Sequence, residues 1–156
     1  MIYVLDTNSL CVLKNFYPTT FPGLWVRIDA LVASGEFISV EEAYGELTKR
    51  VDSEHLLQWV ERNKAIFTPP TEKEMDFVAG IFAVQHFQQL VSQDALLRGG
   101  LVADPWIIAR AHSAGGCVVT EEKLKPNAAK IPNVCDHFQI PWTNVEGLFQ
   151  LQGWRY

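Results

Sequence analysis

Residues 2–9, with the sequence IYVLDTNS, form the stretch on which the fold depends. An apolar run of the kind found in β-strands leads directly to the carboxylate of Asp6, and three small polar residues follow it. Such a run is typical of a central strand that is buried on both faces. In open α/β sheets, reactive groups gather beyond the carboxyl ends of the strands. The stretch therefore predicts a buried first strand with Asp6 in a crevice at its end.

Asp6 also fits a purely structural role. Asp, Thr, Asn and Ser are all good N-cap residues, so Asp6 equally suits the start of the helix expected over residues 8–16. The spacing of this stretch alone leaves both interpretations open. The positions of the other acidic residues bear on the choice.

A second acidic residue stands before another predicted helix. Residues 101–111, LVADPWIIARA, place Asp104 directly before a proline and an apolar helical stripe. Asp as the N-cap and Pro105 as the first helical residue are a strong helix start. A carboxylate at that point would also lie at the crevice edge of the sheet, so the two roles of Asp104 do not exclude each other.

Composition indicates an ordinary globular protein. The 156 residues, 48% of them hydrophobic and 20% charged, predict one domain over residues 1–156. No apolar run approaches the ~18 residues that span a bilayer, and no signal-peptide pattern is present, so we expect a cytoplasmic protein without membrane contact. The three cysteines lack disulfide or metal-finger spacing and are expected to be reduced core residues. A net charge of −5 argues against a protein that coats nucleic acid through phosphate neutralisation.

Strand-like and helix-like segments alternate along the chain. Besides the first strand, strands are expected at residues 37–38, 117–119 and 134–135. Helices are expected between them, and three capping boxes mark helix starts at Ser39 with Glu42, Thr71 with Glu74, and Thr143 with Glu146. This alternation predicts an α/β fold with a mostly parallel sheet that is flanked by helices on both faces.

The acidic residues occur in an order that resembles a known family. The opening LDTN, the acids of the helix after residue 39, Asp104 before its helix, and Thr120-Glu121-Glu122 after a short strand resemble the PIN-domain family. More particularly, they resemble the PIN-like proteins grouped with VapC-type toxins. The resemblance spans residues 6–149 and implies an α/β/α sandwich.

Carried over residue by residue, the resemblance matches Asp6, Glu46 and Asp104 to the first three acids of a metal-dependent nuclease site. The fourth position departs from the family pattern, because Glu122 stands where an Asp is common and Glu121 precedes it. Glu46, followed by Leu47, fits the second position better than Glu42, which we expect to serve in a capping box. The choices between Glu46 and Glu42, and between Glu122 and Glu121, remain open at this point.

The chemistry expected of such a cluster is metal-assisted phosphodiester hydrolysis. Several carboxylates in one pocket repel each other unless a cation is present, and oxygen ligands favour Mg²⁺ or Mn²⁺. Three further side chains, those of Thr7, Asn8 and Thr120, are candidates to hold the acids by hydrogen bonds. Lys123 is a candidate phosphate contact by proximity alone, and a solvated lysine is the preferred interpretation.

The resemblance implies a metal-dependent endoribonuclease, the toxin of a bacterial type II toxin–antitoxin pair. RNA is then the substrate, and a DNA-binding antitoxin and a second copy of the chain are the candidate partners. The alternative is a PIN-like binding or scaffold protein without catalysis, whose acids serve as helix caps. No P-loop or GxGxxG motif is present, so no nucleotide cofactor is expected.

Overall fold

The computed structural model describes residues 1–91 and 102–155, and these residues contain one sheet of five parallel strands. The strand order is β3-β2-β1-β4-β5, so the first strand of the sequence is the central strand of the sheet. Val4 pairs with Ile38 on one side and with Val118 on the other. The strands are β1 (Tyr3–Leu5), β2 (Phe37–Val40), β3 (Phe67–Thr68), β4 (Cys117–Val119) and β5 (Trp142–Thr143).

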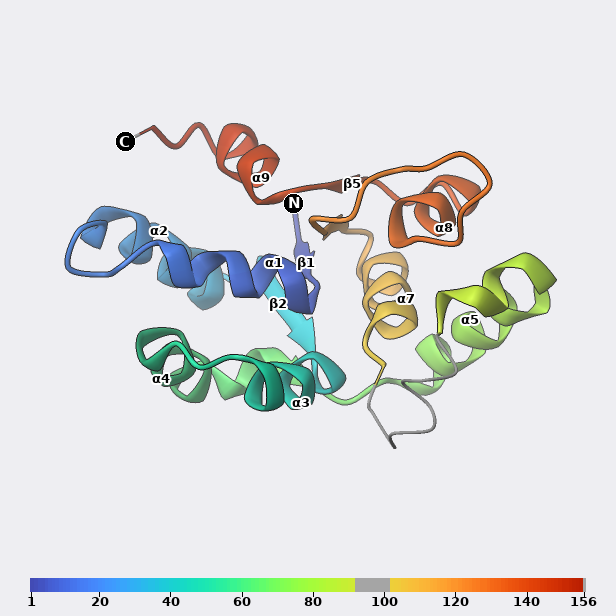
Figure 1. Cartoon of the computed structure of the whole chain (residues 1–156), viewed down its shortest axis with the longest axis horizontal. Helices are drawn as coiled ribbons and strands as arrows, with labels where there is room; N and C mark the ends of the chain where they lie inside the picture. Colours follow the sequence, from blue (N-terminus) through green and yellow to red (C-terminus); the bar gives the residue numbers. More distant parts are fainter. Residues whose placement is uncertain (92–101, 156) are drawn as a thin grey trace.

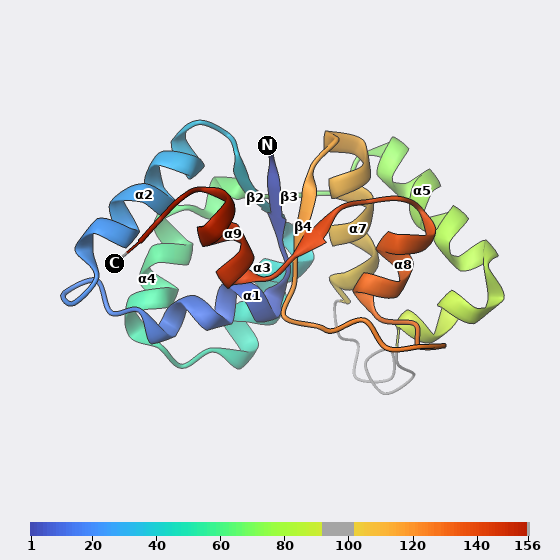
Figure 2. The same cartoon turned by 90° about the horizontal axis from the view of Figure 1, so that it is seen from above.

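Helices cover both faces of the sheet (Figures 1 and 2). Helices α1, α2, α4 and α9 lie on one side in Figure 2, and α5, α7 and α8 lie on the other. Helix α7 packs on β1, β2 and β4, and α5 and α8 pack on α7. The predicted α/β/α sandwich is therefore confirmed. The helices are α1 (Thr7–Val12), α2 (Pro22–Ala33), α3 (Glu41–Arg50), α4 (Glu54–Arg62), α5 (Glu72–Ala83), α7 (Asp104–Ala114), α8 (Ile131–His137) and α9 (Val145–Leu151), with 3-10 turns at Leu13–Asn15, Lys64–Ile66 and Gln85–Leu90.

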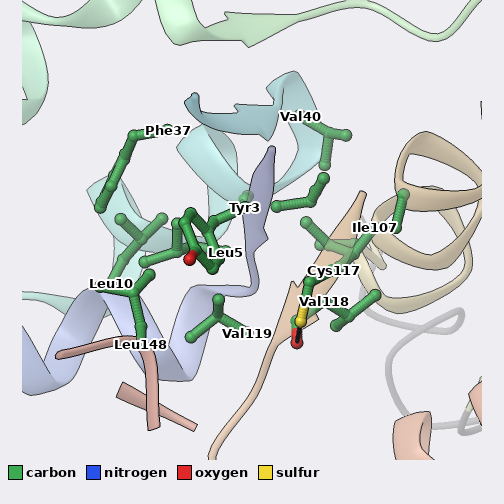
Figure 3. Packing of buried hydrophobic residues seen from close by; sticks show 14 of the residues in the cluster. Tyr3, Leu5, Leu10, Phe37, Val40, Ile107, Cys117, Val118, Val119 and Leu148 are labelled. Carbon is green, nitrogen blue, oxygen red and sulfur yellow. Dashed lines mark hydrogen bonds between the residues drawn. The ribbon is translucent and has the colours of Figure 1, made fainter. Parts of the chain in front are cut away.

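The core lies on both faces of β1, as expected for a central parallel strand. Tyr3, Val4 and Leu5 are all at least 98% buried. Figure 3 shows Tyr3 and Leu5 on the side of Leu10 and Leu148, which belong to α1 and α9. Successive side chains of a strand point to opposite faces, so one short apolar run joins two helical layers. This is why the opening stretch predicts the architecture.

Two of the local sequence signals are confirmed. Thr71 Oγ1 accepts a hydrogen bond from the Glu74 backbone N–H at 3.2 Å, and the Glu74 carboxylate accepts one from the Thr71 N–H at 2.9 Å. This capping box begins α5. Helix α7 ends at Gly115, whose φ of 63° lies in the left-handed region that glycine adopts without strain.

The other two capping boxes are wrong, because the hydroxyl residue lies in a strand. Ser39 belongs to β2, and its hydroxyl donates to the Leu5 carbonyl at 2.8 Å instead of capping α3. Thr143 belongs to β5, and the residue that caps α9 is Asn144, whose side chain accepts from the Gly147 N–H at 2.8 Å. In both places the helix starts later than the hydroxyl suggests.

The strand expected at residues 134–135 is also wrong. These residues belong to α8, with Pro132 in its first turn, and the final strand is β5. Val134 and Cys135 are both fully buried. Their short apolar run fits a buried helix turn as well as a strand, and periodicity cannot separate the two over so few residues.

The remaining features of the fold are the cysteines, the end of α5 and the character of the helices. Cys117 and Cys135 are buried, Cys11 is half-buried, and all three are free thiols. The helix expected over residues 71–88 ends at Ala83 and continues as a 3-10 turn. The bend expected at residues 99–100 lies outside the described residues. Over the described ranges, no helix combines the length and apolar character needed to cross a membrane.

Candidate functional site

An acidic pocket of about 480 Å³ lies at the carboxyl edge of the sheet. Its acidic side chains come from four separate segments: Asp6 after β1, Glu46 in α3, Asp104 at the start of α7 and Glu122 in the loop after β4. The structure thus places all four acids suggested by the family resemblance in one pocket. The remaining lining residues are Thr7, Asn8, Arg50, Gln89, Leu90, Val102, Ala128, Ala129 and Lys130.

Asp6 forms the buried floor of the pocket, with only 2% of its surface exposed. Its carboxylate accepts a hydrogen bond from the Ser9 backbone N–H at 2.7 Å, so Asp6 does cap α1. Burial raises the pKa of Asp6 to about 6, although hydrogen bonds from Thr120 and Ser9 act in the opposite direction. The two interpretations of Asp6 therefore coexist, because one carboxylate both caps a helix and lines the pocket.

Glu46 and Glu122 each hold the start of a helix while they line the pocket. The Glu46 carboxylate accepts from the Ala103 N–H at 2.9 Å, and Ala103 precedes the first residue of α7. The Glu122 carboxylate accepts from the N–H of Ile131, the first residue of α8, at 2.9 Å. Helix N-termini carry unpaired N–H groups and partial positive charge, which favours carboxylates there. These contacts hold both side chains at the pocket.

Asp104 differs from the other three acids. The predicted N-cap role is wrong, because Asp104 is the first residue of α7 and Ala103 occupies the N-cap position. Desolvation, followed by the charges of Glu122, Asp6 and Glu46, raises the pKa of Asp104 to about 8, and the positive charge of Arg50 acts against this shift. The other three acids are thus close enough to disfavour the charged form of Asp104.

Glu42 and Glu121 are not among the residues that line the pocket. Glu42 is buried beside the charges of Arg110 and Glu74, and burial raises its pKa. One of its carboxylate oxygens has no hydrogen-bond partner among the described residues. Glu121 turns the other way from Glu122, and its carboxylate accepts from the N–H of Val145, the first residue of α9, at 2.9 Å. The geometry favours Glu46 and Glu122 over their neighbours.

The three small polar side chains named from the sequence lie close to these acids. Thr120 is fully buried, its hydroxyl hydrogen-bonds to Asp6, and its oxygen accepts from the Glu122 N–H at 3.1 Å. Asn8 is exposed at the pocket rim. Thr7 is 4% exposed and lines the pocket, yet its buried hydroxyl has no partner among the described residues. A buried hydroxyl without a partner is costly, so this one is available to a ligand.

The donor set suits a hydrated hard cation better than a closed metal cage. Among the described residues, no group of three or more His, Cys, Asp or Glu side chains is close enough to ligate one ion together. Mg²⁺ usually keeps several waters and binds directly through only one or two carboxylates. Burial raises the pKa of both aspartates, and for Asp104 the charges of Glu122, Asp6 and Glu46 add to this rise, so a divalent ion would favour the charged forms of both. The residues therefore fit an ion that is held partly through water.

The pKa values predict an unusual pH dependence for the metal-free protein. Asp6 and Asp104 titrate in the folded state at about 6 and about 8, both above the ordinary value of 3.8, so the folded state binds more protons than the unfolded state. Stability from these groups is complete below pH 3.8 and is lost as the pH rises through about 6 and about 8. Urea unfolding in chelator should show this fall, and Asp104→Asn should flatten its upper part. If the free energy of unfolding falls with pH in the same way for wild type and Asp104→Asn, the raised pKa does not belong to Asp104.

The chain therefore belongs to the class of α/β/α sandwich proteins, and it carries a carboxylate-lined pocket at the carboxyl edge of its parallel sheet. The chain is a member of the family described as a domain of unknown function, DUF4411, whose model matches residues 3–156. Among solved structures, a similar chain occurs in the crystal structure of VapBC2 from Rickettsia felis bound to a DNA fragment from their promoter. That chain is 16% identical, the match covers 83% of this chain and 97% of that one, and the TM-score is 0.48. A comparison with curated proteins gave no match.

Proposed function

We propose that this protein is a PIN-like, metal-dependent endoribonuclease that hydrolyses RNA phosphodiester bonds with Mg²⁺ or Mn²⁺. The observation that carries the proposal is the convergence of Asp6, Glu46, Asp104 and Glu122 in one pocket at the carboxyl edge of the sheet. Two of these acids have raised pKa values, which is typical of functional sites. Asp104 is not the N-cap residue of α7, so helix capping does not account for its carboxylate.

The four acids are expected to contact the ion in two different ways, directly or through water. Asp6 and Asp104 are the candidates for direct contact with the ion, because among the described residues neither carboxylate accepts a backbone N–H from a distant segment, as Glu46 and Glu122 do. Glu46 and Glu122 each use one carboxylate oxygen to hold a helix start, and they would bind water of the ion's hydration shell. A divalent ion in such a site supplies an activated water and neutralises charge on the phosphate. The free hydroxyl of Thr7 can hydrogen-bond to that water or to a phosphate oxygen.

The toxin role is the finer part of this proposal, and it rests on the resemblance of the ordered acidic motifs to VapC-type proteins. It implies a DNA-binding antitoxin as partner, a second copy of the chain as a candidate neighbour, and action in the cytoplasm. Induced expression in bacteria should stop growth in a way that depends on Asp104. Growth arrest by wild type and Asp104→Asn alike would contradict the role.

A second candidate is a PIN-like scaffold without catalysis. The observation in its favour is that Asp6, Glu46 and Glu122 all accept backbone N–H groups at helix starts, so each has a structural task. This accounts for three of the four acids and leaves Asp104 and the free Thr7 hydroxyl unexplained. Under this alternative, divalent ions would neither bind nor support cleavage.

Divalent ions should separate the two candidates by stabilising the folded protein, because the ion relieves carboxylate repulsion only in the native arrangement. At manganese concentrations about 100 times Kd, the free energy of unfolding should rise by about 2.7 kcal/mol relative to chelator. Thermal unfolding and cleavage of a labelled single-stranded RNA should both respond to Mn²⁺. Glu121→Gln, which removes one charge outside the pocket, should keep both responses. An unchanged midpoint at saturating Mn²⁺, with no cleavage, would favour the scaffold.

A further inference from the structure

Two cationic side chains, Arg50 and Lys130, line the acidic pocket, although the chain as a whole carries a net charge of −5. Both are exposed, whereas Asp6 on the floor is 2% exposed. The pocket thus has an acidic floor and a rim that contains two cations. Sequence analysis did not single out either residue, and Lys123, which it did name, does not line the pocket.

Arg50 is directed to the pocket by its helix. It stands four residues after Glu46 in α3, and side chains four residues apart lie on the same helix face. Because the Glu46 carboxylate is bound to the start of α7, this face of α3 is turned toward the pocket. The charge of Arg50 also opposes the rise in the pKa of Asp104, in agreement with a guanidinium near the acids.

Lys130 is directed to the pocket by Glu122. The N–H of Ile131, the next residue, donates to the Glu122 carboxylate at 2.9 Å, so the backbone at this point is fixed to an acid of the pocket. Helix α3 packs on α1 and α4, whereas α8, which begins after Lys130, packs on α7. The two cations therefore reach the rim from different sides.

Among the described residues, neither cation forms an ion pair with an acid. The ion pairs there join the Met1 amino group to Glu36, and Arg110 to Glu74. A cation that borders a carboxylate cluster without pairing to it is free to bind an anion that enters from outside. A phosphate chain whose scissile group sits over the acids would present its adjacent phosphates to the rim.

We propose that Arg50 and Lys130 bind the phosphates on either side of the scissile phosphate of a single-stranded RNA. This inference rests on the proposed nuclease function and names how its substrate is held. A single strand is favoured because the scissile phosphate must descend from the exposed rim toward the buried floor, which a flexible backbone allows. Contacts to phosphates position the strand and do not read its sequence. The two residues therefore set affinity and placement, and base preference must come from other contacts.

The test is the salt dependence of RNA binding. Fluorescence anisotropy with a labelled single-stranded RNA, in Ca²⁺ as the hard cation, gives Kd over a range of salt concentrations. Each of Arg50→Gln and Lys130→Gln should reduce the slope of log K against log salt by about 0.7, and the double variant by about twice that amount. In Mn²⁺, the same variants should raise KM for cleavage and leave kcat nearly unchanged. Arg50→Lys and Lys130→Arg should keep the wild-type slope.

Matched controls separate local contacts from general charge. Lys49→Gln and Lys125→Gln make the same change at exposed neighbours that do not line the pocket, and their slopes should equal that of wild type. Equal slopes for all four glutamine variants would overturn the proposal and leave the nuclease function standing if wild type cleaves RNA. Reduced slopes for Arg50→Gln and Lys130→Gln, with no metal-dependent cleavage by wild type, would support phosphate binding at the rim and overturn the nuclease function.

Discussion

Purified Asp104→Asn protein should be folded, unresponsive to Mn²⁺ and impaired in RNA cleavage by more than about 100-fold, the upper range for changes to residues that only support a metal ligand. Asparagine keeps the shape of the side chain and removes the negative charge that an ion would contact. Since burial, together with the charges of Glu122, Asp6 and Glu46, disfavours the ionised form of Asp104, the substitution also removes this cost. Stability without metal should therefore hold or rise. RNA cleavage assays and thermal unfolding in chelator measure the two effects.

The scaffold alternative predicts a different outcome for the same variant. If the acids only cap helices, asparagine replaces aspartate well and cleavage was never present. Asp6→Asn adds a useful comparison, because Asn can still accept from the Ser9 N–H and keep α1 capped. It should be folded and inactive like Asp104→Asn, whereas Glu121→Gln should remain active. Full RNA-cleaving activity in purified Asp104→Asn protein would contradict the proposed metal-dependent mechanism.

Replacement of Arg110 by Met should cost about 3–5 kcal/mol of unfolding free energy, the range found when a buried ion pair loses one partner. Arg110 lies in α7 and is 7% exposed, and its guanidinium binds the Glu74 carboxylate, which is 2% exposed. It also donates to the Ser39 carbonyl at 3.0 Å and to the Pro69 carbonyl at 2.9 Å. One side chain thus joins α7 to α5 and to the ends of β2 and β3. Urea unfolding at neutral pH measures the loss.

The same variant makes a signed prediction in acid. Burial would raise the pKa of Glu74, but hydrogen bonds from Arg110, Thr71 and Ser113 outweigh it and hold that pKa below its usual 4.5. The stability from this carboxylate is present above pH 4.5 and is lost as the pH falls through the lower folded value. The penalty of Arg110→Met should therefore shrink in acid. In neutral solution, adding Glu74→Gln to Arg110→Met should restore part of the lost unfolding free energy. If the loss caused by Arg110→Met changes neither with pH nor with Glu74→Gln, the ion pair is not its cause.

The sequence predicts best where one stretch specifies both a strand and its burial. Residues 2–5 indicate the central strand because every residue there is apolar, and a strand covered on both faces requires this. Residues 67–68 and 142–143 form edge strands of two residues, which are too short for any periodicity to show. The capping boxes predicted at Ser39 and Thr143 are wrong for a related reason, since a hydroxyl before a helix can equally lie at the end of a strand.

The candidate site could be predicted in part. The family resemblance of the ordered acids Asp6, Glu46, Asp104 and Glu122 suggests a shared pocket, and the structure places them there, while their chemical roles stay predictions. Arg50 could have been found from its spacing of four residues after Glu46. Lys130 could not, because only the tertiary bond between Glu122 and Ile131 brings its loop to the pocket.

The two edge strands of the sheet, β3 and β5, have a consequence for self-association. Each contains only two residues, so each edge offers very few unpaired backbone N–H and C=O groups to another chain. Long exposed edges act as templates for strand addition and aggregation, and natural proteins shorten them to prevent it. Strand-to-strand addition at these edges is therefore disfavoured, and association through the side chains of helices and loops is the route that the described sheet leaves open.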